Sequence, residues 1–292
     1  MRSWRIGDVV VHRIDEAILP PPTAAWLLPD VTPEQAAELD PAFRHDDGSL
    51  RLATHTFAVE SEGRRILVDT AVGNHKQRAN PAWHDLDTDW LAGAEAAGFG
   101  PGAVDLVVMT HVHADHVGWN TIFVDGAWIP TFPGARHLTP AAEWAYWTSV
   151  DLEPARAQMI ADSVLPVRDA GLLDTPDVPD DGLALTSAVR LVPTPGHTPG
   201  HVSVEIRSGG DTALISGDAV HHPVQLLHPE VGSCVDVDPG QARRTRDRLL
   251  TRARQRDALL LGTHFPEPTG VRLSNTGDLA RRGGDGHPVP PA

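Results

Sequence analysis

The stretch VDLVVMTHVHADH, residues 104–116, joins an apolar run to a dense group of ionisable side chains. The run VDLVVMT has the continuous hydrophobicity of a strand that is buried on both faces. Side chains that can bind a metal ion follow it within six positions, namely His111, His113, Asp115 and His116. We therefore expect a buried strand that ends in a metal-binding loop.

The spacing within this loop favours two metal ions. His111 and His113 are two positions apart, so in an extended segment they point the same way. Asp115 and His116 follow the bend and can serve a second position nearby. Imidazole and carboxylate are the ligands that zinc-like ions prefer when thiolates are absent, and this chain has one cysteine. Because a tetrahedral ion needs about four ligands, the loop completes neither position alone.

Further candidates follow three other apolar runs. His197 lies in PTPGHTPGH (193–201), Asp218 ends TALISGD and His264 ends ALLLGTH. In α/β folds, sites form at the carboxyl ends of strands, so all three can converge on one edge of the sheets. Spacing alone does not decide between His197 and His201.

The remaining pattern predicts two strand-rich halves, each flanked by helices. Strands are expected over residues 4–14, a hairpin over 55–70 that turns at Glu62-Gly63, and strands over 183–194, 202–208, 212–218 and 258–264. Helices are expected over residues 32–39, 88–97, 139–149, 153–162 and 239–256. This order suggests two stacked sheets between helices, in one domain over residues 1–273. Residues 274–292 lack an apolar period and are expected to be a loosely ordered tail.

Composition excludes several classes of partner. The formal net charge of −15 disfavours nucleic acid, and the Arg-rich segment 243–257 carries Leu249 and Leu250 as a solvated amphipathic helix would. The lone Cys234 cannot form an internal disulfide and is expected to be a small buried residue. No signal peptide or membrane-length apolar run is seen, so we expect a cytoplasmic protein that does not bind membranes.

Five stretches together resemble the metallo-β-lactamase-fold hydrolases. They are LVDT (67–70), THVHADHVG (110–118), TPGHTPGH (194–201), SGD (216–218) and GTHFP (262–266). The resemblance implies an α/β protein, an αββα four-layer sandwich with a dinuclear metal site at one edge of the stacked sheets. In layout the chain is most similar to N-acyl homoserine lactone lactonases and to methyl parathion hydrolase.

The resemblance also implies a ligand set. The first metal would be held by His111, His113 and His197. The second would be held by Asp115, His116 and His264, with Asp218 bridging the two. His201 would then support the ligands, and Asp69 would fix the tautomer of a ligand imidazole. Two divalent ions are expected, Zn²⁺ first, with Fe or Mn as alternatives.

Catalytic and substrate-lining residues are expected around these ligands. The lactonases have a tyrosine three positions after the bridging aspartate, where this chain has His221. We expect His221 to face the metals and contact the substrate, and Asp115 to help move a proton. The residues expected to line the substrate pocket are Trp26, Trp119 and Asn120.

The implied activity is zinc-dependent hydrolysis of a small ester or lactone. Two divalent ions about 3.5–4 Å apart lower the pKa of a shared water, and the resulting hydroxide attacks a carbonyl. The alternatives are a thioester hydrolase of the glyoxalase II type and an iron-dependent oxidoreductase on the same fold. The expected partner is a small-molecule substrate, and a homodimer is left open.

Overall fold

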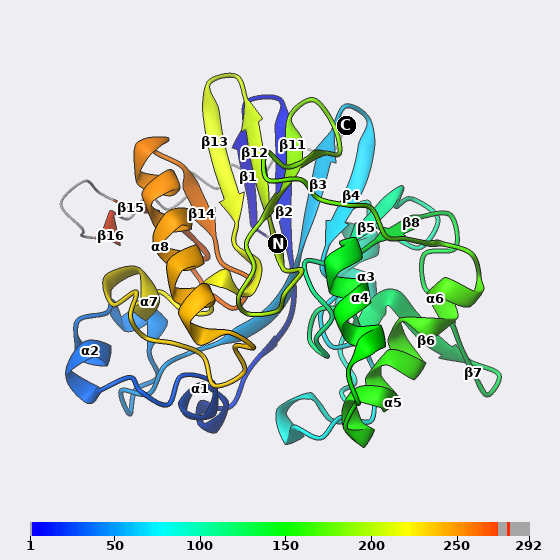
Figure 1. The fold of residues 1–292 in the computed structure, drawn as a ribbon, viewed down its shortest axis with the longest axis horizontal. Helices are drawn as coiled ribbons and strands as arrows, with labels where there is room; N and C mark the ends of the chain where they lie inside the picture. Colours follow the sequence, from blue (N-terminus) through cyan, green and yellow to red (C-terminus); the bar gives the residue numbers. More distant parts are fainter. Residues whose placement is uncertain (1, 274–278, 281–292) are drawn as a thin grey trace.

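Two seven-stranded sheets pack face to face at the centre of the protein (Figure 1). The structure, a computed structural model, describes residues 2–273, 279 and 280. The first sheet has the strand order β1 (Arg2–Ile6), β2 (Val9–Ile18), β3 (Ala53–Ser61), β4 (Arg64–Val68), β5 (Leu106–Val108), β8 (Arg136–Leu138), β9 (Leu173–Asp174). The second has the order β10 (Leu183–Ala184), β11 (Val189–Pro193), β12 (Val202–Ser208), β13 (Asp211–Ile215), β14 (Leu259–Leu261), β15 (Gly270–Leu273), β16 (Leu279–Ala280).

Alternation along the strands builds the core between the sheets. In β12, Val202, Val204 and Ile206 face the first sheet and belong to a buried apolar cluster to which both sheets contribute. The intervening Glu205 faces the opposite way and pairs with Arg252 of the covering helix, with Nη2 and Oε2 2.8 Å apart. This two-residue period places one face of each sheet in the core and the other against helices.

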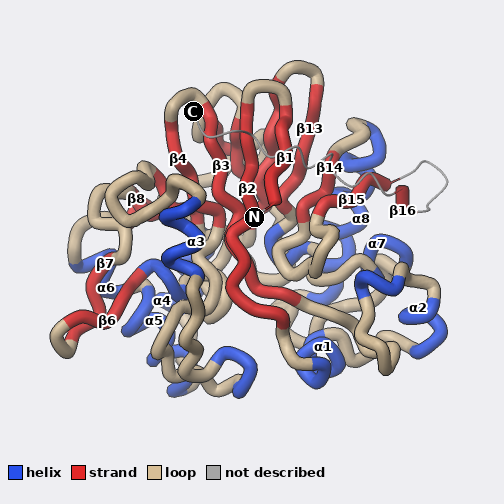
Figure 2. Tube along the Cα trace, turned by 180° about the vertical axis from the view of Figure 1, so that it is seen from behind, coloured by secondary structure: helices blue, strands red, loops and turns tan. Residues whose placement is uncertain are grey.

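Helices cover the outer faces of the sheets (Figure 2). On the first sheet lies α3 (Trp90–Ala96), and beyond it α4 (Ala141–Ser149), α5 (Pro154–Ser163) and α6 (Leu165–Asp169). The outer face of the second sheet is covered by α8 (Pro239–Gln255). Short helices α1 (Pro21–Leu27), α2 (Pro33–Ala37) and α7 (Val224–Leu227) share a separate apolar cluster. A hairpin of β6 (Thr121–Val124) and β7 (Ala127–Pro130) stands apart from both sheets.

These layers confirm the αββα arrangement expected from the sequence. The hairpin at Glu62-Gly63 is confirmed, with φ of 54° and 75° at the two turn residues. The strand pattern over residues 4–14 divides into two strands, because Gly7 adopts a φ of 56° and turns the chain between β1 and β2. In the sequence, the alternation of Trp4 and Ile6 stops at Gly7-Asp8 and resumes one residue out of step at Val9 and Val11, which is the signal of this turn.

Two further expectations need correction or lie partly outside the described residues. Cys234 is exposed rather than buried, because it lies on a surface loop. Its backbone N–H donates to the carbonyl oxygen of Leu27. Within the expected C-terminal tail, Leu279–Ala280 pairs with β15 as strand β16. The other residues of that tail lie outside the described part of the chain.

The Arg-rich helix α8 is amphipathic, as expected. Leu249 and Leu250 are buried against the second sheet. One arginine departs from the solvated face, since Arg246 is fully buried and donates to the carbonyls of Ala219, Pro229 and Val231. In the described part of the chain, no helix is both long and apolar enough to cross a membrane.

Candidate metal centre

The candidate ligands lie together where parallel strands end. Strand β5 runs parallel to β4 and leads into the loop that carries His111 to His116. In the second sheet β13 and β14 are parallel neighbours, and they lead into Asp218 and His264. The carboxyl ends of these strands meet at one edge of the sandwich, which brings together residues up to 153 positions apart (264 − 111).

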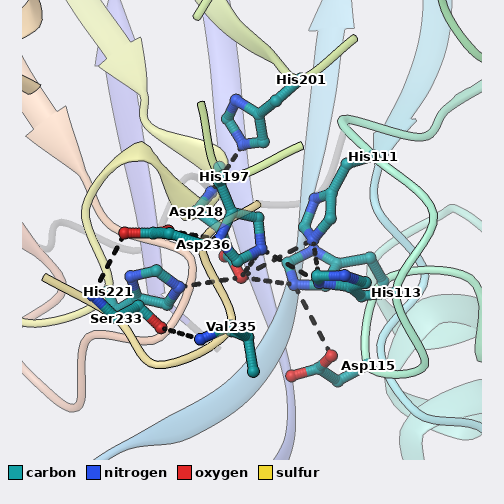
Figure 3. Close-up of polar contacts among 12 residues, drawn as sticks. His111, His113, Asp115, His197, His201, Asp218, His221, Ser233, Val235 and Asp236 are labelled. Carbon is teal, nitrogen blue, oxygen red and sulfur yellow. Dashed lines mark hydrogen bonds and ion pairs between the residues drawn. The ribbon is translucent and has the colours of Figure 1, made fainter. Parts of the chain in front are cut away.

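Four side chains form the first group around Asp218 (Figure 3). His113 Nδ1 lies 3.0 Å from His111 Nε2 and 3.0 Å from His197 Nε2. Asp218 Oδ2 lies 3.7 Å from His111 Nε2 and 3.4 Å from His197 Nε2. Three imidazole nitrogens and a carboxylate oxygen therefore face one point, an arrangement that suits a cation better than hydrogen bonds among the rings.

The second group lies on the other side of the same carboxylate. Asp115, His116 and His264 form it, and His264 Nε2 is 3.5 Å from Asp115 Oδ2. Asp218 reaches this group too, with Oδ2 3.3 Å from His116 Nε2 and Oδ1 3.2 Å from His264 Nε2. His116 Nε2 and Asp218 Oδ1 are buried, and within the described part of the chain neither atom has a hydrogen-bond partner. Buried polar atoms without partners are costly, so this donor set fits a second metal ion.

Acceptors behind the rings decide which nitrogen faces the site. Nδ1 of His264 lies 3.0 Å from the carbonyl oxygen of Ala53, which can only accept, so His264 carries its proton there. His116 Nδ1 is 2.9 Å from Asp69 Oδ2, and His197 Nδ1 is 2.9 Å from Asp236 Oδ1. In each ring Nε2 is left with a free lone pair toward the site, which is the form that binds a metal.

The contacts of His201 exclude it as a ligand. Its Nε2 accepts the backbone N–H of Asp218 at 2.8 Å, and its Nδ1 lies 2.9 Å from Thr194 Oγ1. With both nitrogens engaged, His201 holds the backbone of Asp218 in place. The choice between His197 and His201, which spacing leaves open, therefore falls to His197 on geometry.

Charge is balanced around Asp218. Burial acts to raise the pKa of Asp218, but His116, His264 and His221 outweigh it and hold that pKa well below its ordinary value. Burial acts to lower the pKa of His116, yet Asp218, Asp69 and Asp115 raise it well above its usual range. The site thus stabilises a positive charge beside an ionised carboxylate, and a metal ion can take the place of the proton.

A profile of the Metallo-beta-lactamase superfamily matches residues 50–264, which contain both groups of candidate ligands. The chain belongs to this superfamily. The family and fold predicted from the five motifs are thereby confirmed.

Relatives of this superfamily member include known lactonases. N-acyl homoserine lactonase AttM of Rhizobium radiobacter is 29% identical over 197 residues, or 63% of this chain and 68% of that protein. A probable metal-dependent hydrolase from Staphylococcus aureus shares the fold with a TM-score of 0.76 at 19% identity, covering 95% and 97% of the two chains. AidC, a dizinc quorum-quenching lactonase, has a TM-score of 0.74 at 21% identity, covering 96% and 97%.

His221 faces the site from behind Asp218. Its Nε2 is 3.3 Å from Asp218 Oδ2, while the neighbouring His222 points away and its Nε2 lies 3.1 Å from the carbonyl oxygen of Phe43. The two histidines therefore diverge, and His221 is the one that faces the metal-binding groups. His221 is fully buried and does not line the cavity described below, and among the described residues neither of its ring nitrogens has a hydrogen-bond partner, so its contact with a substrate stays a prediction.

A cavity of about 700 Å³ opens in front of the two groups. Its floor includes His113, Asp115, Asp218 and His264. One wall comes from α1 and the residues before it, and another from α5, and both helices lie beyond the same edge of the sheets (Figures 1 and 2). The walls are mainly apolar, with Leu27, Trp83 and Met159 among the lining residues.

Of the three expected lining residues, only Trp26 lies on this cavity. Trp26 is 45% exposed and meets Trp83 edge to face, with ring centroids 6.2 Å apart. Trp119 and Asn120 are buried elsewhere, and their expected role as lining residues is wrong. Trp119 stacks on Trp90 with centroids 5.1 Å apart and donates to Glu16, and Asn120 accepts from Thr70.

The close approach of Gly118 explains why the chain turns inward here. A Cβ at Gly118 would lie 1.7 Å from the carbonyl oxygen of Val72, so only glycine allows this contact. The contact presses the segment after the metal-binding loop against residues 70–73. The side chain of Trp119 is thereby directed into the core under the first sheet instead of toward the cavity.

Two supporting residues escape the sequence analysis. Asp236 is one, since its carboxylate bonds His197 and also accepts the backbone N–H of Ser233 at 3.1 Å. Glu143 is the other, a fully buried residue of α4. Its carboxylate accepts from Val112 N at 2.9 Å and from Gly200 N at 3.1 Å. Glu143 thus connects the two loops that carry the histidines. No spacing in the sequence predicts a role for Glu143 or Asp236.

Proposed function

We propose that this protein is a dinuclear-metal hydrolase, with zinc as its first-choice metal, that cleaves a small ester or lactone. The observation that carries the proposal is the position of Asp218, whose two carboxylate oxygens face two separate groups of imidazoles and carboxylates. The relationship to lactonase AttM supports the same class of substrate.

The residues would divide into two ligand sets and their supports. His111, His113 and His197 would hold one ion, and Asp115, His116 and His264 the other, with Asp218 shared. Asp69 and Asp236 would keep His116 and His197 in the tautomer that binds metal. When bound, two divalent ions would polarise a carbonyl and supply hydroxide from water near neutral pH.

The chain's own side chains would act around that chemistry. Asp115 lines the cavity at its floor, where a carboxylate can accept a proton from the attacking water and pass it to the leaving oxygen. His221 would act through Asp218, because its Nε2 lies 3.3 Å from Asp218 Oδ2 and the residue does not line the cavity. The apolar walls would bind the hydrocarbon part of the substrate and exclude water.

The test is metal analysis followed by a substrate panel. We expect two metal ions per chain in active protein, and hydrolysis of lactones or carboxylic esters in preference to phosphotriesters and thioesters. Preference for thioesters would favour the glyoxalase II type of activity instead. A single iron per active chain would point to the oxidoreductase alternative and would overturn the proposal.

A further inference from the structure

Basic residues gather at one wall of the cavity, although the chain has a formal net charge of −15. Arg78 and Arg156 both line it. Arg78 is buried and its guanidinium is held by Asp162, at 2.7 and 2.9 Å. Lys76 lies behind, fully buried, with Nζ 3.7 Å from Asp162 Oδ1. The Asp162 carboxylate is therefore shared by two cations, Arg78 and Lys76.

Arg156 carries a further charge that no partner neutralises. It lies on α5, and its guanidinium carbon is 5.3 Å from the ring centroid of Trp147. Over the described residues its guanidinium makes no hydrogen bond and no ion pair within 4.0 Å. Glu153, one turn earlier, also lines the cavity but is exposed. The Trp147 ring contacts the guanidinium through a cation–π interaction, which uses none of its N–H groups and leaves them available for a ligand.

Arg156 lies close enough to the metal groups to act on the same ligand. Both Arg156 and His113 line the cavity. The ring of Trp147 contacts both residues, and its centroid lies 5.6 Å from that of His113. A molecule whose carbonyl lies at the cavity floor would thus reach Arg156 with a group a few bonds away. The residues of α1 that line the opposite wall, namely Pro22, Thr23, Trp26 and Leu27, carry no charge.

We propose that the preferred substrate carries a carboxylate a few bonds from its scissile ester or lactone carbonyl, and that Arg156 binds this carboxylate. The inference rests on the proposed hydrolase function and narrows its substrate class. A guanidinium fork matches the two oxygens of a carboxylate, and the pairing is strong where water is partly excluded. Arg78 and Lys76 already share Asp162, whereas Arg156 has no carboxylate partner among the described residues, so a substrate carboxylate would pair with Arg156.

The kinetic test compares two esters of equal size. We would measure kcat/KM of the zinc-loaded protein for the mono-4-nitrophenyl ester of glutaric acid and for its neutral primary amide. We expect the acid to be preferred by at least about tenfold, the worth of one charge-assisted hydrogen bond. Arg156→Gln should reduce this ratio to about one. The matched control is Arg168→Gln, since Arg168 lies on α6 with a 47% exposed side chain and should leave the ratio unchanged.

A binding measurement separates this inference from the hydrolase proposal. Glutaranilic acid and its neutral amide are anilides that resist cleavage, and calorimetry would give the affinity of each for the wild type and for Arg156→Gln. We expect the acid to bind about tenfold tighter to the wild type only. If no ester is cleaved but this difference holds, the hydrolase proposal fails and the carboxylate site stands. An equal preference in Arg156→Gln would assign the carboxylate to other groups and overturn the inference.

Discussion

The metal-binding groups and the cavity wall in front of them are held by the chain in different ways. Six of the seven candidate ligands are buried, and His116, His197 and His264 each have a ring nitrogen held by an acceptor behind the ring. The wall comes from the short helix α1, the loop over residues 78–83 and α5, and it exposes Trp26. From this difference we expect substitutions in the wall to change substrate selectivity more than metal binding.

The largest effect is expected from removing the carboxylate that the two metal-binding groups share. Asp218→Ala should lower turnover at least about a thousandfold and reduce metal content, because one oxygen-bearing group faces both sets of imidazoles. Metal analysis and steady-state kinetics on the best substrate check this. Unchanged metal content and turnover would exclude Asp218 as a bridge.

His221→Phe should reduce turnover by about 10- to 100-fold while both ions stay bound, since supporting hydrogen bonds to ligands have that worth. The reason is the loss of the contact between His221 Nε2 and Asp218 Oδ2, which are 3.3 Å apart. His221→Gln keeps a donor and should recover part of the loss. If His221→Phe loses a metal ion, His221 is itself a ligand. If the variant keeps full turnover, His221 has no role in the reaction.

A milder change behind the ligands sharpens the contrast further. Asp236→Asn should weaken the affinity for one of the two ions by about tenfold, because the amide no longer favours the His197 tautomer that binds metal. Competition with a chelator would measure the affinities of the two ions separately. Asp238→Asn is the control, since that residue caps α8 and does not contact the site. Equal affinities in the two variants would contradict this role.

On the wall itself, Trp26→Ala should raise KM by about 2- to 10-fold for long-chain substrates, the range expected for loss of one aromatic contact. The value of kcat and the metal content should stay near those of the wild type, because Trp26 contacts Trp83 rather than a ligand. Short-chain substrates provide the comparison within one variant. A loss of metal would show that wall and ligands are coupled after all.

How much could be predicted from the sequence follows the same division. Candidate ligands such as His111 and His264 directly follow strands. The end of a continuous apolar run predicts where such a strand ends, and therefore where these ligands lie. Asp236 and Glu143 were missed because their partners, His197 and Gly200, lie tens of residues away and only the folded chain brings them together. Long-range pairing of this kind leaves no period in the sequence.

Nearness in the sequence also misled at Trp119. It follows the metal-binding loop by three positions, yet the contact between Gly118 and Val72 turns it into the core. Trp26, far from any ligand in the sequence, reaches the cavity through α1. For His221 the position was predicted, but whether its ring would face the cavity or the back of Asp218 depends on packing that a motif does not encode.

The exposure of Cys234 has a practical consequence. As the one thiol in 292 residues, it gives a single attachment point for a fluorescent reporter without any prior removal of cysteines. The adjacent Val235 lines the cavity, so a dye at Cys234 would sense changes at the entrance when a ligand enters. Partial burial and the nearby Asp236 raise the pKa of the Cys234 thiol, which makes labelling slow at neutral pH and faster in mildly alkaline buffer.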